Sequence, residues 1–178
     1  MTAARVALGY RDYAALPDDG KRYEIHEGEL SVTPAPGPRH QGVSIALASA
    51  LHTHVIEGGL GRVYAAPIDV ILSETTIVQP DIVFVAVDRS AIISARGIEG
   101  APTLVVEILS PSTVQTDRGR KLQLYARHGV PYCWIVDPDS RAIEVYRGGA
   151  LVARRGGDDI DRLEPFGDLR LSSSALWL

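Results

Sequence analysis

The segment Leu104-Val105-Val106-Glu107-Ile108-Leu109-Ser110 decides the fold, because it is a short apolar run interrupted by a single carboxylate. Such a run is typical of a central strand in an α/β sheet, covered by other elements on both faces. Glu107 would then be an ionisable group inside the protein, where burial without a partner is strongly unfavourable. The sequence therefore predicts a metal ion, a lysine or a hydrogen-bond donor beside Glu107. The structural alternative is a glutamate at a strand end, bonded to backbone or paired with an arginine.

Length and composition are those of an ordinary globular protein. With 178 residues, we expect a single domain spanning residues 1–178. The hydrophobic share of 46% and the charged share of 22% argue against a disordered or fibrous chain. The net charge of −4 gives no global basic field of the kind that marks many nucleic-acid binders. A local basic groove, or a carboxylate site neutralised by divalent metal, stays compatible with this charge.

The sequence also predicts the cellular location of the protein and the state of its cysteine. No apolar run reaches the roughly 18 residues that a membrane helix needs, and the first residues lack an apolar segment followed by a cleavage site. We expect a cytoplasmic protein without a membrane partner. The single cysteine, Cys133, excludes an intrachain disulfide and a multi-cysteine zinc site. Because it lies in the apolar run 132–136, it is predicted to be a core or strand residue rather than a reactive thiol.

Local patterns predict the elements that precede the Glu107 strand. They are a short helix over 10–16, a hairpin of residues 23–26 and 29–32, a helix from His40 to about Glu57, extended runs over 62–72 and 78–87, and a short helix stopped by Gly97. In the hairpin, Gly28 supplies a positive φ, and alternation puts Glu24 and His26 on one face. His40 follows a proline-rich loop, and either a place in a cleft or a capping role fits it.

A helix is predicted over residues 117–128, capped by Thr116 and ended by Gly129. One polar stripe runs along it, made of Asp117, Lys121, Tyr125 and His128. A solvated face is the simplest interpretation of this stripe, with Leu122 and Ala126 turned towards the sheet. A second hairpin of residues 132–136 and 143–146 follows, and then a tail of edge strand and loop.

Asp81 and Glu107 lie on successive predicted strands, which an adjacent pairing or a crossover would bring to one end of the sheet. Two carboxylates placed in this way can hold Mg²⁺, which prefers hard oxygen ligands. Such an ion lowers the pKa of a bound water and neutralises charge as a phosphodiester is hydrolysed. Lys121, on the helix that follows, can reach back across the strand end and add positive charge. Together these residues predict metal-dependent phosphodiester hydrolysis.

The chain resembles the Uma-type putative restriction endonucleases, a family of the PD-(D/E)XK nuclease superfamily. The matching motifs, spread over roughly residues 10 to 147, are Tyr23-Glu24-Ile25, Gly28-Glu29-Leu30, His40-Gln41, Pro80-Asp81, the Glu107 strand ending in Ser110-Pro111-Ser112, then Asp117, Lys121, Tyr125, and Gly129 to Pro138. The resemblance implies an α/β fold with a restriction-endonuclease-like core, in which a mixed central β-sheet is flanked by helices on both faces.

The resemblance also implies roles for individual residues. Asp81 and Glu107 would be catalytic metal ligands for Mg²⁺, or for Mn²⁺ in its place, and Lys121 would be the cation that stabilises the transition state. Leu109 occupies the position where the superfamily pattern has its lysine, so Lys121 is the replacement. Glu24 is a further candidate for the catalytic and metal-binding set, with Glu29 of the same hairpin as the alternative.

The expected function is that of a Mg²⁺-dependent endonuclease that hydrolyses phosphodiester bonds in DNA. Because duplex DNA has two strands, a homodimer is expected, formed through exposed strands such as the Tyr132–Tyr146 hairpin. Two alternatives stay open. One is a non-catalytic module on the same fold that binds nucleic acid or protein, which the acidic net charge and the missing in-strand lysine favour. The other is a metal-dependent hydrolase of a smaller phosphoester.

Overall fold

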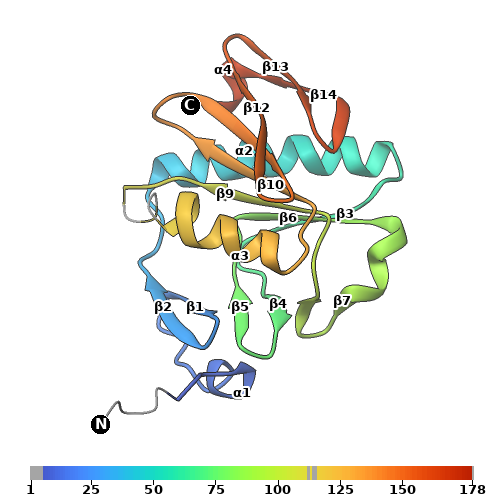
Figure 1. The fold of residues 1–178 in the computed structure, drawn as a ribbon. Coiled ribbons are helices and arrows are strands. Elements are labelled where there is room, and N and C mark those ends of the chain that lie inside the picture. The colour runs from blue at the N-terminus through green and yellow to red at the C-terminus, as the bar shows by residue number, and fades with distance from the viewer. Residues whose placement is uncertain (1–5, 112, 114–115, 178) are drawn as a thin grey trace.

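The computed structural model describes residues 6–111, 113 and 116–177 of the chain. Ser112, part of the segment predicted to break the Glu107 strand, lies outside these residues, as does the side chain of Asp117 from the predicted polar stripe. In the described residues the strands form two six-stranded sheets and a separate two-stranded hairpin. Figure 1 shows these layers together with the helices between and beside them.

The central sheet contains the Glu107 strand in its interior. Its strands run in the order β12-β11-β10-β9-β6-β3. They are β3 (Gly61–Ala65), β6 (Ile82–Ala86), β9 (Leu104–Ile108), β10 (Tyr132–Asp137), β11 (Ala142–Arg147) and β12 (Ala150–Gly156). Strand β9 pairs with β10 in parallel and with β6 antiparallel, so the sheet is mixed. Every residue of β9 is buried, which confirms the predicted central strand.

Successive residues of β9 face different helices. Val106 packs on the face covered by α2 (Pro38–Glu57), together with the hairpin of β13 (Asp159–Leu163) and β14 (Phe166–Ser172) and the short α4 (Ser173–Leu176). Val105 packs on the opposite face, against α3 (Leu122–Arg127). Figure 1 shows α2 and α3 on the two sides of β9. Glu107 lies two residues after Val105, so the alternation of side chains along a strand puts its carboxylate on the same face, towards α3.

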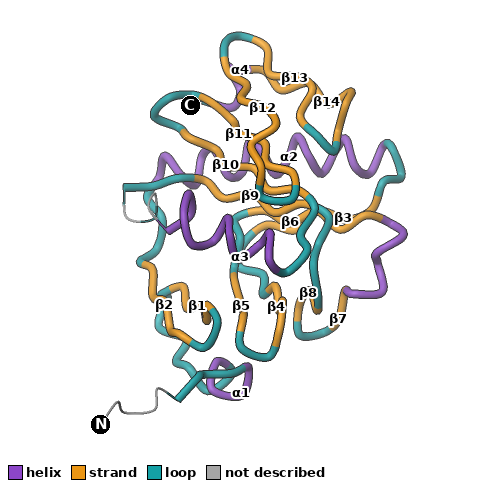
Figure 2. Tube along the Cα trace, viewed as in Figure 1, coloured by secondary structure: helices purple, strands orange, loops and turns teal. Residues whose placement is uncertain are grey.

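The second sheet lies beyond α3 and carries the predicted N-terminal hairpin (Figure 2). Its order is β2-β1-β5-β4-β8-β7, and the short helix α1 (Tyr10–Tyr13) lies beside β1 and β5. The strands are β1 (Arg22–His26), β2 (Glu29–Thr33), β4 (Val70–Ser73), β5 (Thr76–Val78), β7 (Ile93–Ser94) and β8 (Gly97–Glu99). The hairpin turn uses two positive φ angles, 53° at Glu27 and 85° at Gly28. A side chain at Gly28 would meet the Cβ of Ala7 at 2.7 Å.

The predicted extended runs were too long. The run 62–72 divides into β3 of the central sheet and β4 of the second sheet, and the run 78–87 divides between the end of β5 and β6. The predicted helix stop at Gly97 was also wrong, because the 3₁₀ helix η1 (Val87–Ile92) ends before β7. Gly97 instead begins β8 with a φ of 133°, and a Cβ there would lie 2.3 Å from the carbonyl oxygen of Asp69.

The helix predicted over 117–128 has a different geometry in its first half. It begins as the π-helical turn η2 (Thr116–Lys121) and continues as α3, so Thr116 is the first helical residue rather than the cap. The solvated stripe was wrong for Lys121 and Tyr125, which are only 3% and 1% exposed. A π-helical turn closes i→i+5 bonds and therefore shifts which residues face the sheet. Leu124 is fully buried there, while Leu122, predicted to face the sheet, is partly buried against the same core.

The C-terminal half of the central sheet confirms some predictions and corrects another. Strands β10 and β11 form the predicted second hairpin, and Cys133 is a buried core residue. Strand β12 pairs along the outer side of β11. The Tyr132–Tyr146 hairpin is therefore interior to the sheet, and its prediction as an exposed dimer surface was wrong. None of the helices in the described part of the chain has both the length and the apolar character needed to cross a bilayer.

Candidate active site

Asp81, the residue just before β6, lies opposite Glu107 of the neighbouring strand β9. Strands β6 and β9 pair with Ile82 opposite Val106, and the backbone N–H of Asp81 donates to the Val106 carbonyl at 3.0 Å. Extending this register by one residue sets Asp81 opposite Glu107 on the same face of the sheet. Both side chains are buried, and both line a cavity of about 110 Å³. The structure thus brings together the two acids that the sequence singled out.

Lys121, the last residue of η2, extends its side chain into the same cavity. Its Nζ lies 2.7 Å from Glu107 Oε1 and 3.0 Å from Glu24 Oε1, so one ammonium group is shared by carboxylates from two sheets. The Tyr125 hydroxyl, one helical turn further on, donates to Glu107 Oε1. Burial and the negative charges of Glu107 and Glu24 raise the pKa of Tyr125 well above its usual value. Tyr125 therefore keeps its proton and acts as a donor.

Glu24 enters the site from β1 and is held by several donors. The backbone N–H of Gln79 donates to Glu24 Oε1 at 2.7 Å, and His26 Nε2 lies 3.1 Å from Oε2. Burial alone would raise the pKa of Glu24, but the Lys121 ammonium and the His26 hydrogen bond lower it to about 2. Glu24 is therefore ionised at neutral pH. The alternative, Glu29, pairs instead with Arg120 at 2.8 Å, and its side chain is 44% exposed.

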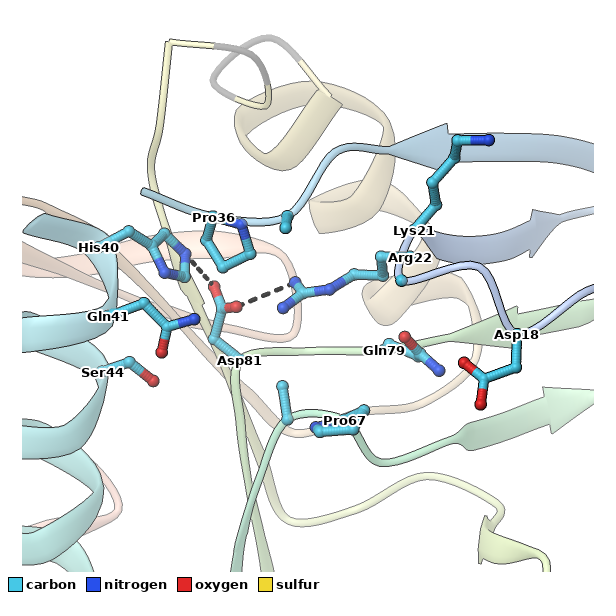
Figure 3. A pocket seen from close by; sticks show the side chains of 13 residues that line it. Asp18, Lys21, Arg22, Pro36, His40, Gln41, Ser44, Pro67, Gln79 and Asp81 are labelled. Atoms are coloured by element: carbon cyan, nitrogen blue, oxygen red, sulfur yellow. Dashed lines mark hydrogen bonds and ion pairs between the residues drawn. The ribbon is translucent and has the colours of Figure 1, made fainter. Parts of the chain in front are cut away.

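Asp81 is held by two basic side chains and one backbone donor. Arg22 Nη1 donates to Oδ1 at 2.9 Å, while His40 Nε2 at 3.1 Å and the backbone N–H of Ile108 at 2.8 Å meet Oδ2. Figure 3 shows Arg22 and His40 approaching the carboxylate from different sides. Burial alone would raise the pKa of Asp81, but the hydrogen bond and charge of His40 and the charge of Arg22 outweigh it and lower that pKa. Asp81 is thus ionised as well.

Several residues of this site were missing from the sequence-based prediction. Arg22, His26 and Gln79 had no predicted role, and His40 was left between a cleft position and a cap. A signal for two of them existed: Arg22, Glu24 and His26 alternate along β1, so strand periodicity puts them on one face. Gln79 contacts Glu24 through its backbone N–H, so the pattern of side chains in the sequence did not indicate this contact.

The donor set fits a divalent cation held by two carboxylates. Asp81 and Glu107 offer hard oxygen atoms in one cavity, and Mg²⁺ is commonly held by one or two carboxylates with water and substrate phosphate completing its shell. Within the described ranges, no group of three or more His, Cys, Asp or Glu side chains is arranged to hold a metal ion. The oxygens of Glu24 are engaged by Lys121, His26 and the Gln79 backbone, as those of Asp81 are by Arg22, His40 and the Ile108 backbone.

This mixed sheet, covered by helices on both faces and carrying acids at the ends of adjacent strands, has the restriction-endonuclease-like fold. A crystal structure described as a putative nuclease belonging to DUF820, from Anabaena variabilis ATCC 29413, superposes with a TM-score of 0.79 at 23% sequence identity. The match covers 96% of this chain and 97% of that chain. The family model described as "Uma2: Putative restriction endonuclease" matches residues 10–173, so the chain belongs to the Uma2 family. Among curated proteins, no significant match was found.

Proposed function

We propose that the protein is an endonuclease that hydrolyses phosphodiester bonds in DNA and depends on Mg²⁺, with Mn²⁺ able to replace it. The observation that carries this proposal is the position of Lys121 Nζ, 2.7 Å from Glu107 Oε1 in a cavity that Asp81 also lines. An ammonium group fixed in such a cavity would stabilise the negative charge that develops on a reacting phosphate. Membership of a family described as a putative restriction endonuclease supports the same class of reaction.

In this proposal each residue of the site has a separate role. Asp81 and Glu107 would hold the cation, which when bound supplies an activated water and neutralises charge on the phosphate. Lys121 contributes a fixed positive charge beside them. Tyr125 positions the Glu107 carboxylate through its hydroxyl. Glu24 positions Lys121 by accepting from its ammonium at 3.0 Å, and the further role of Glu24 as a metal ligand stays a prediction.

The test is cleavage of supercoiled plasmid by the purified protein in Mg²⁺, in Mn²⁺ or in EDTA. We expect cation-dependent cleavage that is lost in Glu107→Gln and in Asp81→Asn. Glu144→Gln is the matched control, because Glu144 is a buried acid of the same sheet that pairs with Arg118 at 2.8 Å and does not line the site cavity. This control should cleave like the wild type. Wild-type cleavage by Glu107→Gln, in a preparation free of contaminating nuclease, would overturn the proposal.

One observation favours a second candidate function, a non-catalytic module that binds nucleic acid or protein. Both oxygens of Asp81 and both oxygens of Glu24 are already hydrogen-bonded, as buried acids retained for packing would be. Titration calorimetry with Mn²⁺ separates the two candidates. A nuclease should bind Mn²⁺ at a site that Asp81→Asn removes, whereas a packing role predicts no binding. Cleavage of a model phosphodiester but not of DNA would instead identify a hydrolase of smaller phosphoesters.

We also propose that the protein acts as a homodimer, because the two strands of a duplex call for two active sites. Since β12 covers the outer side of β11, the contact has to use surfaces other than the Tyr132–Tyr146 hairpin. Light scattering coupled to gel filtration should give twice the chain mass. A monomer that still makes double-strand breaks would contradict this arrangement.

A further inference from the structure

Arg22 stands at the junction of two cavities. It lines the cavity of about 110 Å³ that holds Glu107 and Lys121, and it also lines a neighbouring cavity of about 330 Å³. Figure 3 draws the larger cavity, with Arg22 extending across it to Asp81. The side chain of Arg22 is 19% exposed, against 3% for that of Asp81. A ligand arriving from solvent can therefore reach the guanidinium group more easily than the carboxylate it holds.

The larger cavity is lined by charged and uncharged polar side chains together with apolar ones, a mixture that suits part of a nucleotide. Its volume is at the lower end of the range usual for small-ligand sites. Its uncharged polar side chains are Gln41, Ser44 and Gln79, its basic ones are Lys21, Arg22 and His40, and its acids are Asp18 and Asp81. Lys21 already pairs with Asp19 at 2.7 Å, on the surface. Arg22 differs from Lys21 because its partner is one of the two acids assigned to the cation.

A divalent cation and the Arg22 guanidinium would compete for Asp81. The guanidinium donates to Asp81 Oδ1 at 2.9 Å, so a cation held by this carboxylate would lie close to a group of the same sign. Arg22 would then give up the contact, and its planar set of donors would need another anion. A phosphate diester matches that geometry, because guanidinium groups can bind two phosphate oxygens at once.

We propose that Arg22 exchanges partners during the reaction: it holds Asp81 until a divalent cation binds, and then binds a DNA phosphate next to the cleaved one, in the larger cavity. This inference rests on the proposed nuclease function and adds a phosphate-binding subsite to it. It also couples the two ligands, because cation binding frees the residue that DNA then uses. Arg22 is thus a substrate-binding residue that shields Asp81 before the cation arrives.

The first arm of the test is calorimetry with Mn²⁺ in the absence of DNA. We expect Arg22→Gln to bind Mn²⁺ on the order of tenfold more tightly than the wild type, because it lacks a charged hydrogen bond that competes for Asp81. Arg147→Gln is the matched control. It makes the same substitution in an exposed pair with Glu164, 3.1 Å apart, and should bind Mn²⁺ like the wild type.

The second arm measures DNA binding by fluorescence anisotropy over a range of salt concentrations, with Ca²⁺ or without divalent cation. A labelled duplex of mixed sequence suffices, because phosphate contacts carry no sequence information. In Ca²⁺, Arg22→Gln should reduce the slope of log K against log salt by about 0.9, the value for one phosphate contact. Without divalent cation its slope should equal that of the wild type, since Arg22 is then bound to Asp81.

The outcomes separate this inference from the proposed function. Wild-type Mn²⁺ affinity and wild-type salt slopes in Arg22→Gln would overturn the exchange and leave the nuclease proposal standing. No Mn²⁺ binding by the wild-type protein would overturn both. If Arg22→Gln fails to fold, Arg22→Lys takes its place in the test. Lysine keeps a positive charge beside Asp81 but lacks the planar set of donors of arginine. This variant should bind Mn²⁺ like the wild type and bind DNA several-fold more weakly in Ca²⁺, and unchanged DNA affinity would overturn the phosphate contact.

Discussion

Two glutamates of the central sheet, Glu107 on β9 and Glu144 on β11, are both buried and both paired with a cation from η2. Arg118 donates to both oxygens of Glu144, at 2.8 and 2.9 Å, and the side chain of Arg118 is 36% exposed. Lys121 is only 4% exposed and is shared between Glu107 and another carboxylate. Arg118 also donates to Asp137 Oδ2, at 3.2 Å, so each cation is shared by two acids, but Arg118 lies near the surface and Lys121 lies in the interior.

The difference shows which buried charge is suited to chemistry. Arg118 uses a separate guanidinium nitrogen for each of its two acids, Nη1 for Glu144 and Nη2 for Asp137, whereas Lys121 offers both of its acids one compact ammonium group. Glu107 also lines a cavity with Asp81, and Glu144 does not line it. We infer that the Arg118–Glu144 pair stabilises the sheet, while the Lys121–Glu107 pair leaves charge available to a ligand. The predictions below test this contrast with matched substitutions.

Replacing the cations should give the largest difference. Lys121→Met leaves Glu24 and Glu107 buried without their shared cation, which should lower the free energy of unfolding by about 3–5 kcal/mol. Arg118→Met removes partly exposed contacts with Glu144 and Asp137 and should cost about 1 kcal/mol. Urea unfolding monitored by circular dichroism measures both. Equal losses for the two variants would contradict the contrast.

Acid should destabilise the site through Glu24, whose pKa is lowered from 4.5 to about 2 by folding. Because the folded-state pKa is the lower one, ionised Glu24 contributes its full stabilisation above pH 4.5, and this contribution is lost as the pH falls towards 2. The free energy of unfolding should fall by about 1.4 kcal/mol for each pH unit between the two pKa values. Glu24→Gln should therefore lose less stability than the wild type between these pH values. Glu29→Gln, on the exposed part of the same hairpin, serves as the control and should follow the wild type. Identical acid dependence in Glu24→Gln and the wild type would contradict the assignment.

Removing a tyrosine hydroxyl should have the smallest effect and still distinguish the two glutamates. The hydroxyl of Tyr125 donates to Glu107, and that of Tyr146 donates to Glu144 at 3.0 Å. Tyr125→Phe and Tyr146→Phe should each lower stability by about 1 kcal/mol. Only Tyr125→Phe should also slow plasmid cleavage, by several-fold, because it loosens the Glu107 carboxylate. A similar slowing in Tyr146→Phe would show that the two sites are not functionally distinct.

The sequence predicted best those features that local patterns determine. The buried run around Glu107 became β9, and both predicted hairpins formed where turn residues separate alternating strands. Lys121 was expected near Glu107, and the structure places the two 2.7 Å apart. These successes share a cause: each depends on periodicity, turn chemistry or short separation along the chain.

The remaining features depend on long-range packing. Periodicity did not show that the run 62–72 supplies β3 to one sheet and β4 to another, because alternation does not specify the partner strand. The π-helical turn η2 was missed, and it is this turn that carries Lys121 into the interior. Alternation along β1 puts Arg22 on the face of Glu24, but no spacing along the chain reports its contact with Asp81, which lies at the end of another sheet.

The most direct test of the account is anomalous diffraction from a crystal soaked in Mn²⁺. We predict one anomalous peak bound by the carboxylates of Asp81 and Glu107, with the Lys121 ammonium beside Glu107. A peak bound elsewhere, or no peak in crystals of a preparation that cleaves plasmid, would contradict the assignment of these acids as the metal ligands.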